Sequence, residues 1–342
     1  APFAVDPAPA PFAVDPATAS FAVDPATAWV PAVGSRPAAE PIEVTAGLAP
    51  LLADISRLVR PRIAVMVLAT VVSAAWLTAG RPADPARLGW LLLGTALVAA
   101  SSSIANQVLE RRTDRLMRRT ASRPLAAGRL AVPTAWQLAG GTLAAGAFIS
   151  WLAAGWPAAA AGVATWLVYV LAYTPLKQIT PLNTAVGAVA GAMPVAIGWL
   201  AADGPSRLAA GDARGALAVL ALATVLYLWQ FPHFMAIAWI YRAQYAAAGS
   251  RMLTVVDPSG LRAAGQALAA AILLVPAALV LAVPSGSIRM FLAAAVAGSV
   301  YLLATVWFAV YRDDAAARFL LLASLGSLLG LLTAAVVFGG PG

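Results

Sequence analysis

The chain contains no cysteine, one lysine, one histidine and few charged residues of any kind. The absence of cysteine excludes disulfide bonds, thiolate metal sites and haem attached through cysteine. Only 11% of the 342 residues are charged, whereas 61% are hydrophobic. The mean hydropathy of +0.83 lies outside the range of a soluble globular domain. The composition therefore predicts an integral membrane protein.

The apolar residues occur in runs that are long enough to cross a bilayer. A helix that rises 1.5 Å per residue needs about 20 apolar residues to cross roughly 30 Å of hydrocarbon. The runs are continuous, without the alternation of barrel strands, so the sequence predicts an all-α integral membrane fold with nine transmembrane helices. The nine runs are 61–80, 88–107, 132–153, 157–174, 182–201, 215–238, 262–283, 288–310 and 317–339.

The first 50 residues have a different composition. The motif FAVDPA recurs at positions 3, 12 and 21, and alanine and proline dominate the segment. Such a segment cannot bury enough apolar surface to fold, so residues 1–50 are predicted to be a disordered tail. One membrane domain is expected over residues 54–340.

The basic residues are distributed unevenly among the predicted loops. Sixteen of them fall on one side of the membrane and five on the other, with one more in the tail. The positive-inside rule then predicts a cytoplasmic amino terminus and an outside carboxyl terminus, as in a bacterial inner membrane. The net charge of +8 sits mostly in loops next to the lipid bilayer, so we expect no nucleic-acid partner.

The densest charge lies between the second and third predicted spans. Asn106, Glu110 and Asp114 recur every four residues, so a helix places them on one face over roughly 12 Å. Their oxygen atoms suit a Mg²⁺ ion that shares the phosphates of a substrate, and guanidinium groups suit phosphate oxygens. Alternatively, the two acids form surface ion pairs of about 0.3–0.5 kcal/mol each with adjacent arginines, and the arginines anchor anionic lipid. The arginines expected to contact phosphate are Arg111, Arg115, Arg118, Arg119 and Arg123.

Two further stretches combine polar residues with proline. In YTPLK, Lys177 is the only lysine, and its ammonium either binds a phosphate or serves as a topology charge. Gly187 and Gly191 then form a small face that allows close helix packing. In WQFPHF, the single histidine, His233, follows a proline near the end of an apolar helix, where a polar ring needs a partner. A lone membrane histidine is more often a packing group than a ligand.

The three stretches, in this order, resemble the motifs of the UbiA superfamily of intramembrane prenyltransferases and, within it, the haem O synthase branch. The resemblance covers residues 54–340. Two positions depart from the pattern, because Glu110 and Gln244 stand where the family usually has aspartate. The matching residues are Asn106, Asp114, Met117, Arg119, Thr120, Arg123, Pro124 and Leu125, then 173–177, Asn183 and the stretch GAMPVAIGW, and finally Trp229, Gln230, Pro232, His233, Phe234 and Tyr245.

The resemblance implies a UbiA-type bundle with a lateral apolar cavity under a cytoplasmic cap built from the loops after the second and sixth spans. It implies Mg²⁺-dependent transfer of a farnesyl group from farnesyl diphosphate to a vinyl group of haem B, which gives haem O, the substrate of a haem A synthase. Metal binding would fall to Asn106, Glu110 and Asp114, with one metal ion expected because the amide Gln244 is a weak ligand. Lys177 would face the diphosphate, and His233 would contact the porphyrin. Substrate-binding roles are expected for Tyr173, Asn183, Trp229, Gln244 and Tyr245, of which the aromatic rings could face an allylic cation.

Two other functions fit parts of this pattern. A different UbiA-type prenyltransferase would act on an aromatic acid or a quinone precursor, but the PHF motif and Gln244 favour haem. A haem-handling membrane protein without catalysis would form no product from the two substrates and Mg²⁺. A transporter is less consistent with the sequence, because the two halves of the chain show no convincing repeat.

Overall fold

The computed structural model describes residues 48–80 and 84–339, so nearly all of the predicted tail, with its FAVDPA repeats, lies outside the described residues. The described part is all-helical, with no strand in these two ranges. The helices follow one another in the order α1 (Leu48–Val59), α2 (Pro61–Ala79), α3 (Pro85–Leu116), α4 (Val132–Leu167), the π-helix η3 (Val168–Tyr173), α5 (Thr174–Ile179), α6 (Asn183–Ala192), α7 (Pro194–Ala201), α8 (Gly204–Ala209), α9 (Arg214–Ile240), α10 (Arg242–Ala247), α11 (Leu253–Val256), α12 (Leu261–Val280), α13 (Ile288–Tyr311) and α14 (Asp314–Phe338).

The sequence marks most of the helix ends locally. Proline stands in the first turn of α2, α3 and α4, where its missing N–H costs no hydrogen bond. Asp84, Ser287 and Asp313 precede α3, α13 and α14, and each side chain accepts a hydrogen bond from a backbone N–H of the first turn. Gly80 ends α2 with φ of 66°, a conformation that glycine adopts without strain.

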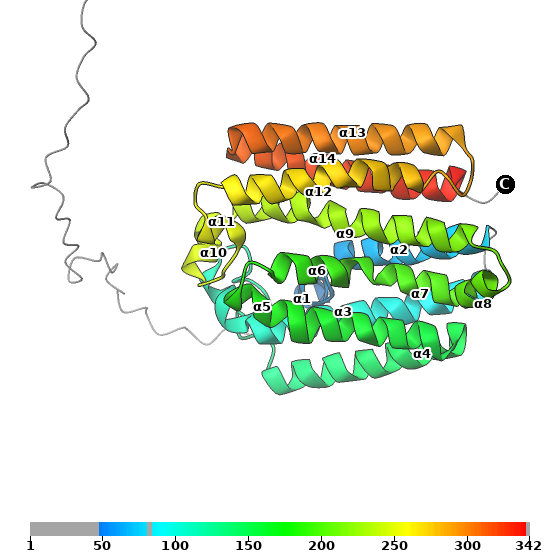
Figure 1. Cartoon of the computed structure of the whole chain (residues 1–342). Helices are drawn as coiled ribbons and strands as arrows, with labels where there is room; N and C mark the ends of the chain where they lie inside the picture. The colour runs from blue at the N-terminus through cyan, green and yellow to red at the C-terminus, as the bar shows by residue number, and fades with distance from the viewer. Residues whose placement is uncertain (1–47, 81–83, 340–342) are drawn as a thin grey trace, which may run out of the picture. The chain divides into compact units, whose positions relative to one another are not determined.

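Eight helical segments are long and apolar enough to span a membrane, and one of them contains a turn. Val132–Ile179 is 48 residues long, and Gly155 interrupts it with φ of 82° and ψ of 167°. Ser101 donates a hydrogen bond to the carbonyl of Ala139 and accepts one from Trp166, two residues that a straight helix would separate by roughly 40 Å. The chain therefore reverses at Gly155, as Figure 1 shows for the ribbon of α4. The nine predicted spans are confirmed in this way among the described residues.

Small residues allow the spans to approach closely. A Cβ atom on Gly187 would lie 2.6 Å from Cε2 of Tyr173, and one on Gly191 would lie 2.6 Å from the Cδ atom of Gln230. The predicted face of small residues, which lies on α6, is therefore confirmed. On the neighbouring pair α3 and α4, a Cβ atom on Gly94 would lie 2.8 Å from the carbonyl oxygen of Gly146.

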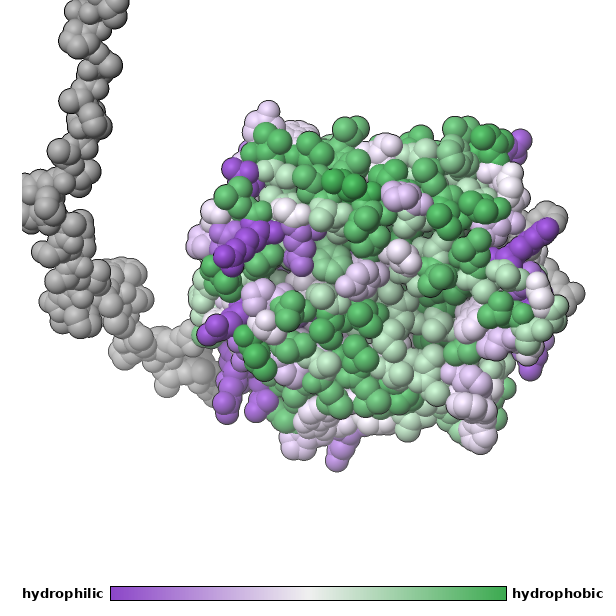
Figure 2. All heavy atoms as spheres, viewed as in Figure 1, coloured by the Kyte–Doolittle hydropathy of each residue, from purple (hydrophilic) through white to green (hydrophobic). Residues whose placement is uncertain are grey.

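The spans form a bundle whose sides are apolar. In Figure 2 the visible face is hydrophobic along the length of the spans, and hydrophilic atoms gather at its two ends. In Figure 1, α5, α10 and α11 lie at one end of the bundle and α8 lies at the other. The helix α9 packs against α2, α6, α12 and α14. The chain is thus a multi-pass integral membrane protein.

The short helix α1 lies across the spans, since Figure 1 shows it nearly end-on while they run lengthwise. Its first three residues fall inside the segment that the sequence assigned to the tail, and its leucines Leu51 and Leu52 are more than half exposed. Asp54 of α1 accepts two hydrogen bonds from Arg129, at 2.7 and 2.8 Å. These bonds hold the pKa of the Asp54 carboxyl below its usual range. The ion pair therefore ties α1 to the segment between α3 and α4.

Candidate active site

Asn106, Glu110 and Asp114 form a row along one face of α3, called here the α3 polar row. The row is inside the protein, because Asn106 is fully buried and the side chains of Glu110 and Asp114 are 14% and 1% exposed. A carboxylate that loses water in this way must gain partners of opposite charge. The contacts of the two acids show where those partners come from.

Each acid of the row is paired with a base from another segment. Lys177 Nζ of α5 lies 2.6 Å from Glu110 Oε1. Arg123 Nη1, from the segment after α3, lies 2.7 Å from both carboxylate oxygens of Asp114 and 3.9 Å from Glu110 Oε2. The alternative of surface ion pairs with arginines on the same helix is therefore wrong. The pairs are largely buried, and they join α3 to the segment that follows it and to α5, 67 positions away from Glu110.

Asn106 at the inner end of the row has two partners that the sequence did not indicate. Its amide donates a hydrogen bond to the hydroxyl of Thr174 at 3.0 Å, and its carbonyl oxygen accepts one from Arg60 Nη2 at 3.2 Å. Arg60 precedes α2 with φ of 51°, in the left-handed region. The next residue of α3, Gln107, donates a hydrogen bond to the carbonyl of Leu58 at 2.9 Å and so ties α3 to α1. Arg60 thus adds a third basic group to the row.

Lys177 is held between an acid and an aromatic ring. Its ammonium lies 4.4 Å from the centroid of the Tyr173 ring, and Tyr173 packs against Tyr169 at 5.3 Å. A cation in this position is attracted by the face of the ring. Gly187 leaves the space that the Tyr173 ring occupies. The residues predicted around the only lysine are therefore brought to the α3 polar row.

Asn183 lies beside the turn that follows Lys177. Its amide donates to the carbonyl of Thr180 at 2.7 Å, and its own carbonyl oxygen is buried without a hydrogen-bond partner among the described residues. The backbone N–H of Arg251 donates to the carbonyl of Lys177 at 2.8 Å. The segment after α10 is thus fastened to the turn, and one amide oxygen is left available there.

The predicted arginines have different environments. Arg119 connects the segment after α3 to the segment after α9. Its backbone N–H donates to Gln244 Oε1 at 3.3 Å, and its side chain donates to the hydroxyl of Tyr245 at 2.9 Å. Its guanidinium also lies 4.5 Å from the ring centroid of Tyr241. This contact supports a cap formed by the segments after α3 and α9. Arg115 donates to the carbonyl of Ala126, within the segment after α3. Arg111 donates to a carbonyl of its own helix and Arg118 is exposed, so neither is brought to the row by these contacts.

The donor set of the row fits one magnesium ion. Two carboxylates and an amide oxygen are hard ligands, and Mg²⁺ usually takes one or two carboxylates together with substrate phosphates. The row has two carboxylates, and among the residues that the structure describes no group of three or more His, Cys, Asp or Glu could hold a metal ion. Asp257, the sequence's candidate to replace a second acid, accepts hydrogen bonds from Ser259 and from the backbone of Arg262. These bonds tie its side chain to the first turn of α12, and the expected single metal ion stays a prediction.

His233 lies in a second polar cluster, the histidine network, which consists of Trp229, His233, Tyr301 and Ser324. The His233 ring stacks on Trp229 at 4.6 Å, and its Nδ1 lies 2.7 Å from Ser324 Oγ. Trp229 donates to the carbonyl of Ser324 at 2.8 Å, and Tyr301 donates to the carbonyl of Trp229 at 2.6 Å. The network joins α9, α13 and α14 inside the apolar part of the bundle.

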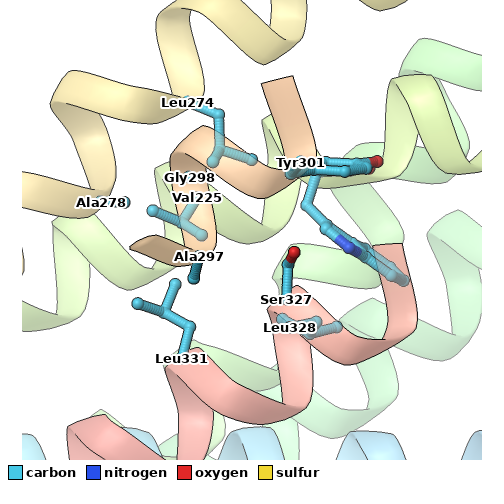
Figure 3. A pocket seen from close by; sticks show the side chains of 10 residues that line it. Val225, Leu274, Ala278, Ala297, Gly298, Tyr301, Ser327, Leu328 and Leu331 are labelled. Atoms are coloured by element: carbon cyan, nitrogen blue, oxygen red, sulfur yellow. The ribbon is translucent and has the colours of Figure 1, made fainter. Parts of the chain in front are cut away.

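A small cavity borders the histidine network (Figure 3). It has a volume of about 10 Å³, comparable with the space that one water molecule needs. Tyr301 and Ser327 are its polar lining residues, together with apolar residues such as Leu274 and Leu331. A second cavity, of about 670 Å³, lies against Arg214 and Ser285. Neither borders the α3 polar row, so the lateral apolar cavity stays a prediction.

Comparison with known proteins decides the family. The profile described as the UbiA prenyltransferase family matches residues 67–339. The chain belongs to this family. A relative from Rhodopirellula baltica named protoheme IX farnesyltransferase is 45% identical over 251 residues, which cover 73% of this chain and 84% of the relative. A protein of the same name from Opitutus terrae is 38% identical over 287 residues, which cover 83% and 94%.

Solved structures show the same UbiA-type fold. A digeranylgeranylglyceryl phosphate synthase structure matches with a TM-score of 0.68 and 15% identity, over 84% of this chain and 98% of that chain. A UbiA homologue from Archaeoglobus fulgidus, bound to GPP and Mg²⁺, matches with a TM-score of 0.58 and 16% identity, over 83% and all of that chain. These neighbours confirm the predicted fold class.

Proposed function

We propose that this protein transfers a farnesyl group from farnesyl diphosphate to a vinyl group of haem B and thereby makes haem O. The observation that carries the proposal is the α3 polar row. Its buried acids are paired with Lys177 and Arg123, bases that a phosphate could displace, in a chain that belongs to a prenyltransferase family. The relatives named protoheme IX farnesyltransferase support haem as the acceptor. The identity of the prenyl donor is inferred from the same names.

The charges of the row suit the binding of a diphosphate with one Mg²⁺. Asn106, Glu110 and Asp114 would hold the ion, which supplies positive charge that stabilises the departing pyrophosphate. Lys177 and Arg123 would then exchange their carboxylate partners for phosphate oxygens, since ammonium and guanidinium groups bind both kinds of anion. The bases thus keep the buried acids neutralised until the substrate arrives.

The reaction needs no nucleophilic side chain. The C–O bond between the farnesyl group and the diphosphate breaks, and pyrophosphate leaves with the bonding electron pair. The allylic carbon forms a C–C bond with the haem vinyl group, water adds to the resulting cation and a proton is released. The ring of Tyr173, beside Lys177, offers an electron-rich face to the allylic cation.

The remaining assignments concern the surroundings of the reaction. We place the row on the cytoplasmic side of a bacterial inner membrane, with the amino terminus inside and the carboxyl terminus outside. Farnesyl diphosphate is charged and would enter from that side, and haem B would reach the histidine network within the bilayer. A haem A synthase would consume the product.

Mass spectrometry of the porphyrin tests the proposal directly. Purified protein in lipid nanodiscs is incubated with haem B, farnesyl diphosphate and Mg²⁺, and the extracted porphyrin is expected to gain one farnesyl group and one hydroxyl group. A parallel incubation replaces haem B with 4-hydroxybenzoate. Prenylated hydroxybenzoate with unchanged haem would refute haem as the acceptor, and no product in either arm would refute prenyl transfer to these acceptors.

A further inference from the structure

The hydrogen bonds of the histidine network define which nitrogen of His233 carries a proton. Ser324 Oγ lies 2.6 Å from the carbonyl oxygen of Leu321, one turn earlier in α14, and 2.7 Å from His233 Nδ1. A carbonyl oxygen can only accept, so the single hydroxyl proton of Ser324 is donated to Leu321. Ser324 Oγ is therefore an acceptor towards His233, and Nδ1 must carry the hydrogen.

This tautomer leaves the lone pair of His233 on Nε2. No hydrogen bond to Nε2 occurs among the residues that the structure describes, and this nitrogen is not among the buried polar atoms that lack a partner. The imidazole is partly exposed, although it lies within the apolar part of the bundle. An accessible, unprotonated ring nitrogen in such surroundings is free to coordinate a metal ion.

The rest of the network keeps the ring in one orientation. Trp229 stacks on the imidazole and is itself fixed by its hydrogen bond to the carbonyl of Ser324. Tyr301 is fully buried and donates to the Trp229 carbonyl in the turn before His233. Trp229, Tyr301 and Ser324 thus hold the ring with Nδ1 directed at Ser324 and with Nε2 unpaired among the described residues.

We propose that Ser324 is a positioning residue: it accepts a hydrogen bond from His233 Nδ1 and so presents Nε2 as an axial ligand to the iron of the haem acceptor. The inference rests on the proposed function for the identity of the acceptor. In metal sites, an acceptor behind a ligating histidine fixes the tautomer and makes the other nitrogen a stronger donor, and its loss typically weakens binding 10- to 100-fold.

The test uses mesohaem, in which ethyl groups replace the two vinyl groups, so that binding is measured without transfer. Ferrous mesohaem is titrated into the full-length protein in nanodiscs, and the affinity is taken from the Soret band. Resonance Raman spectra then report the iron–histidine stretching band, whose frequency depends on the hydrogen bond at Nδ1. The variants are His233→Ala, Ser324→Ala and the control Ser327→Ala, which removes a hydroxyl without a hydrogen-bond partner one turn later in α14.

The inference predicts an iron–histidine band in the unmodified protein and no such band in His233→Ala. In Ser324→Ala the band shifts to lower frequency and mesohaem affinity falls about 10-fold, whereas Ser327→Ala changes neither. The inference would be overturned if the unmodified protein showed no iron–histidine band, or if Ser324→Ala and Ser327→Ala changed the band and the affinity equally. Because mesohaem cannot be farnesylated, a protein that shows the band but forms no haem O from haem B would refute the proposed function alone. Unaltered thermal unfolding of each variant confirms that it folds.

Discussion

Asp114 is the most deeply buried charge of the α3 polar row, and both of its oxygens contact one nitrogen of Arg123. This residue offers the sharpest test of the row, because asparagine has the same shape, keeps one oxygen for Arg123 and removes only the charge. We expect Asp114→Asn to lower farnesyl transfer by about 100-fold or more, as loss of a group that stabilises transition-state charge commonly does. The measurement is haem O formation under saturating substrates.

The matched control for this variant is Asp257→Asn. Asp257 is also a carboxylate that accepts hydrogen bonds, but it is partly exposed and lies just before α12. Its replacement is expected to leave haem O formation within about twofold of the unmodified protein, since surface substitutions usually have small effects. A fully active Asp114→Asn, with an unchanged melting temperature, would rule out a metal role for the row.

The pair of Glu110 and Lys177 tests the idea that the bases neutralise the row before substrate binds. Lys177→Met leaves a carboxylate largely buried without its 2.6 Å partner, which we expect to cost about 3 kcal/mol of stability. Glu110→Gln combined with Lys177→Met removes both charges, so part of that loss should return. Thermal unfolding in nanodiscs without substrate measures both variants. Equal destabilisation by the single and the double variant would contradict this account.

The sequence predicted the members of the row better than their contacts. Helical spacing was sufficient to place Asn106, Glu110 and Asp114 on one face, because that face is a local property of α3. Lys177 was expected near phosphate on resemblance, and the structure does bring it to Glu110. Arg60 and Thr174 were not predicted, since they lie 46 and 68 positions from Asn106 and meet it only through the packing of separate helices.

At the scale of helices, close packing between α3 and α4 depends on residues without side chains. An added Cβ atom on Gly94 would lie within 3 Å of the Gly146 carbonyl and of the Ser150 backbone nitrogen. We expect Gly94→Ala to destabilise the bundle by about 1–3 kcal/mol, because helix backbones cannot yield as a flexible side chain would. Gly141→Ala in α4 is the control, since a Cβ atom there meets nothing within 4 Å. Comparable melting temperatures for the two variants would show that the contact tolerates a methyl group.

The nine apolar runs predicted the spans well because length and hydropathy are sufficient to define a helix in lipid. The ends were less certain: α3 continues to Leu116, nine residues beyond the predicted end of its run, and carries Glu110 and Asp114 past the apolar stretch. The helix α1 was not predicted, because it is short and follows a segment rich in proline. The π-helix η3 also left no pattern of its own in the sequence.

For the whole molecule, the uneven distribution of arginine predicts which end faces the cytoplasm, and the absence of cysteine makes that prediction easy to test. Ser122 lies in the segment between α3 and α4, beside the arginines, and Ser206 lies in α8 at the opposite end of the bundle. Both are exposed, and cysteine differs from serine by one atom. Each of Ser122→Cys and Ser206→Cys therefore introduces the only thiol of the chain.

In intact cells, a maleimide that cannot cross membranes should label Ser206→Cys and leave Ser122→Cys unlabelled until the inner membrane is permeabilised. This outcome would place the α3 polar row at the inner face, where a charged prenyl diphosphate is soluble. The reverse pattern of labelling would mean that the bundle has the opposite orientation in the membrane. The diphosphate would then have to reach the row from outside, and an inner-membrane enzyme supplied with prenyl diphosphate from the cytoplasm could not work in that orientation.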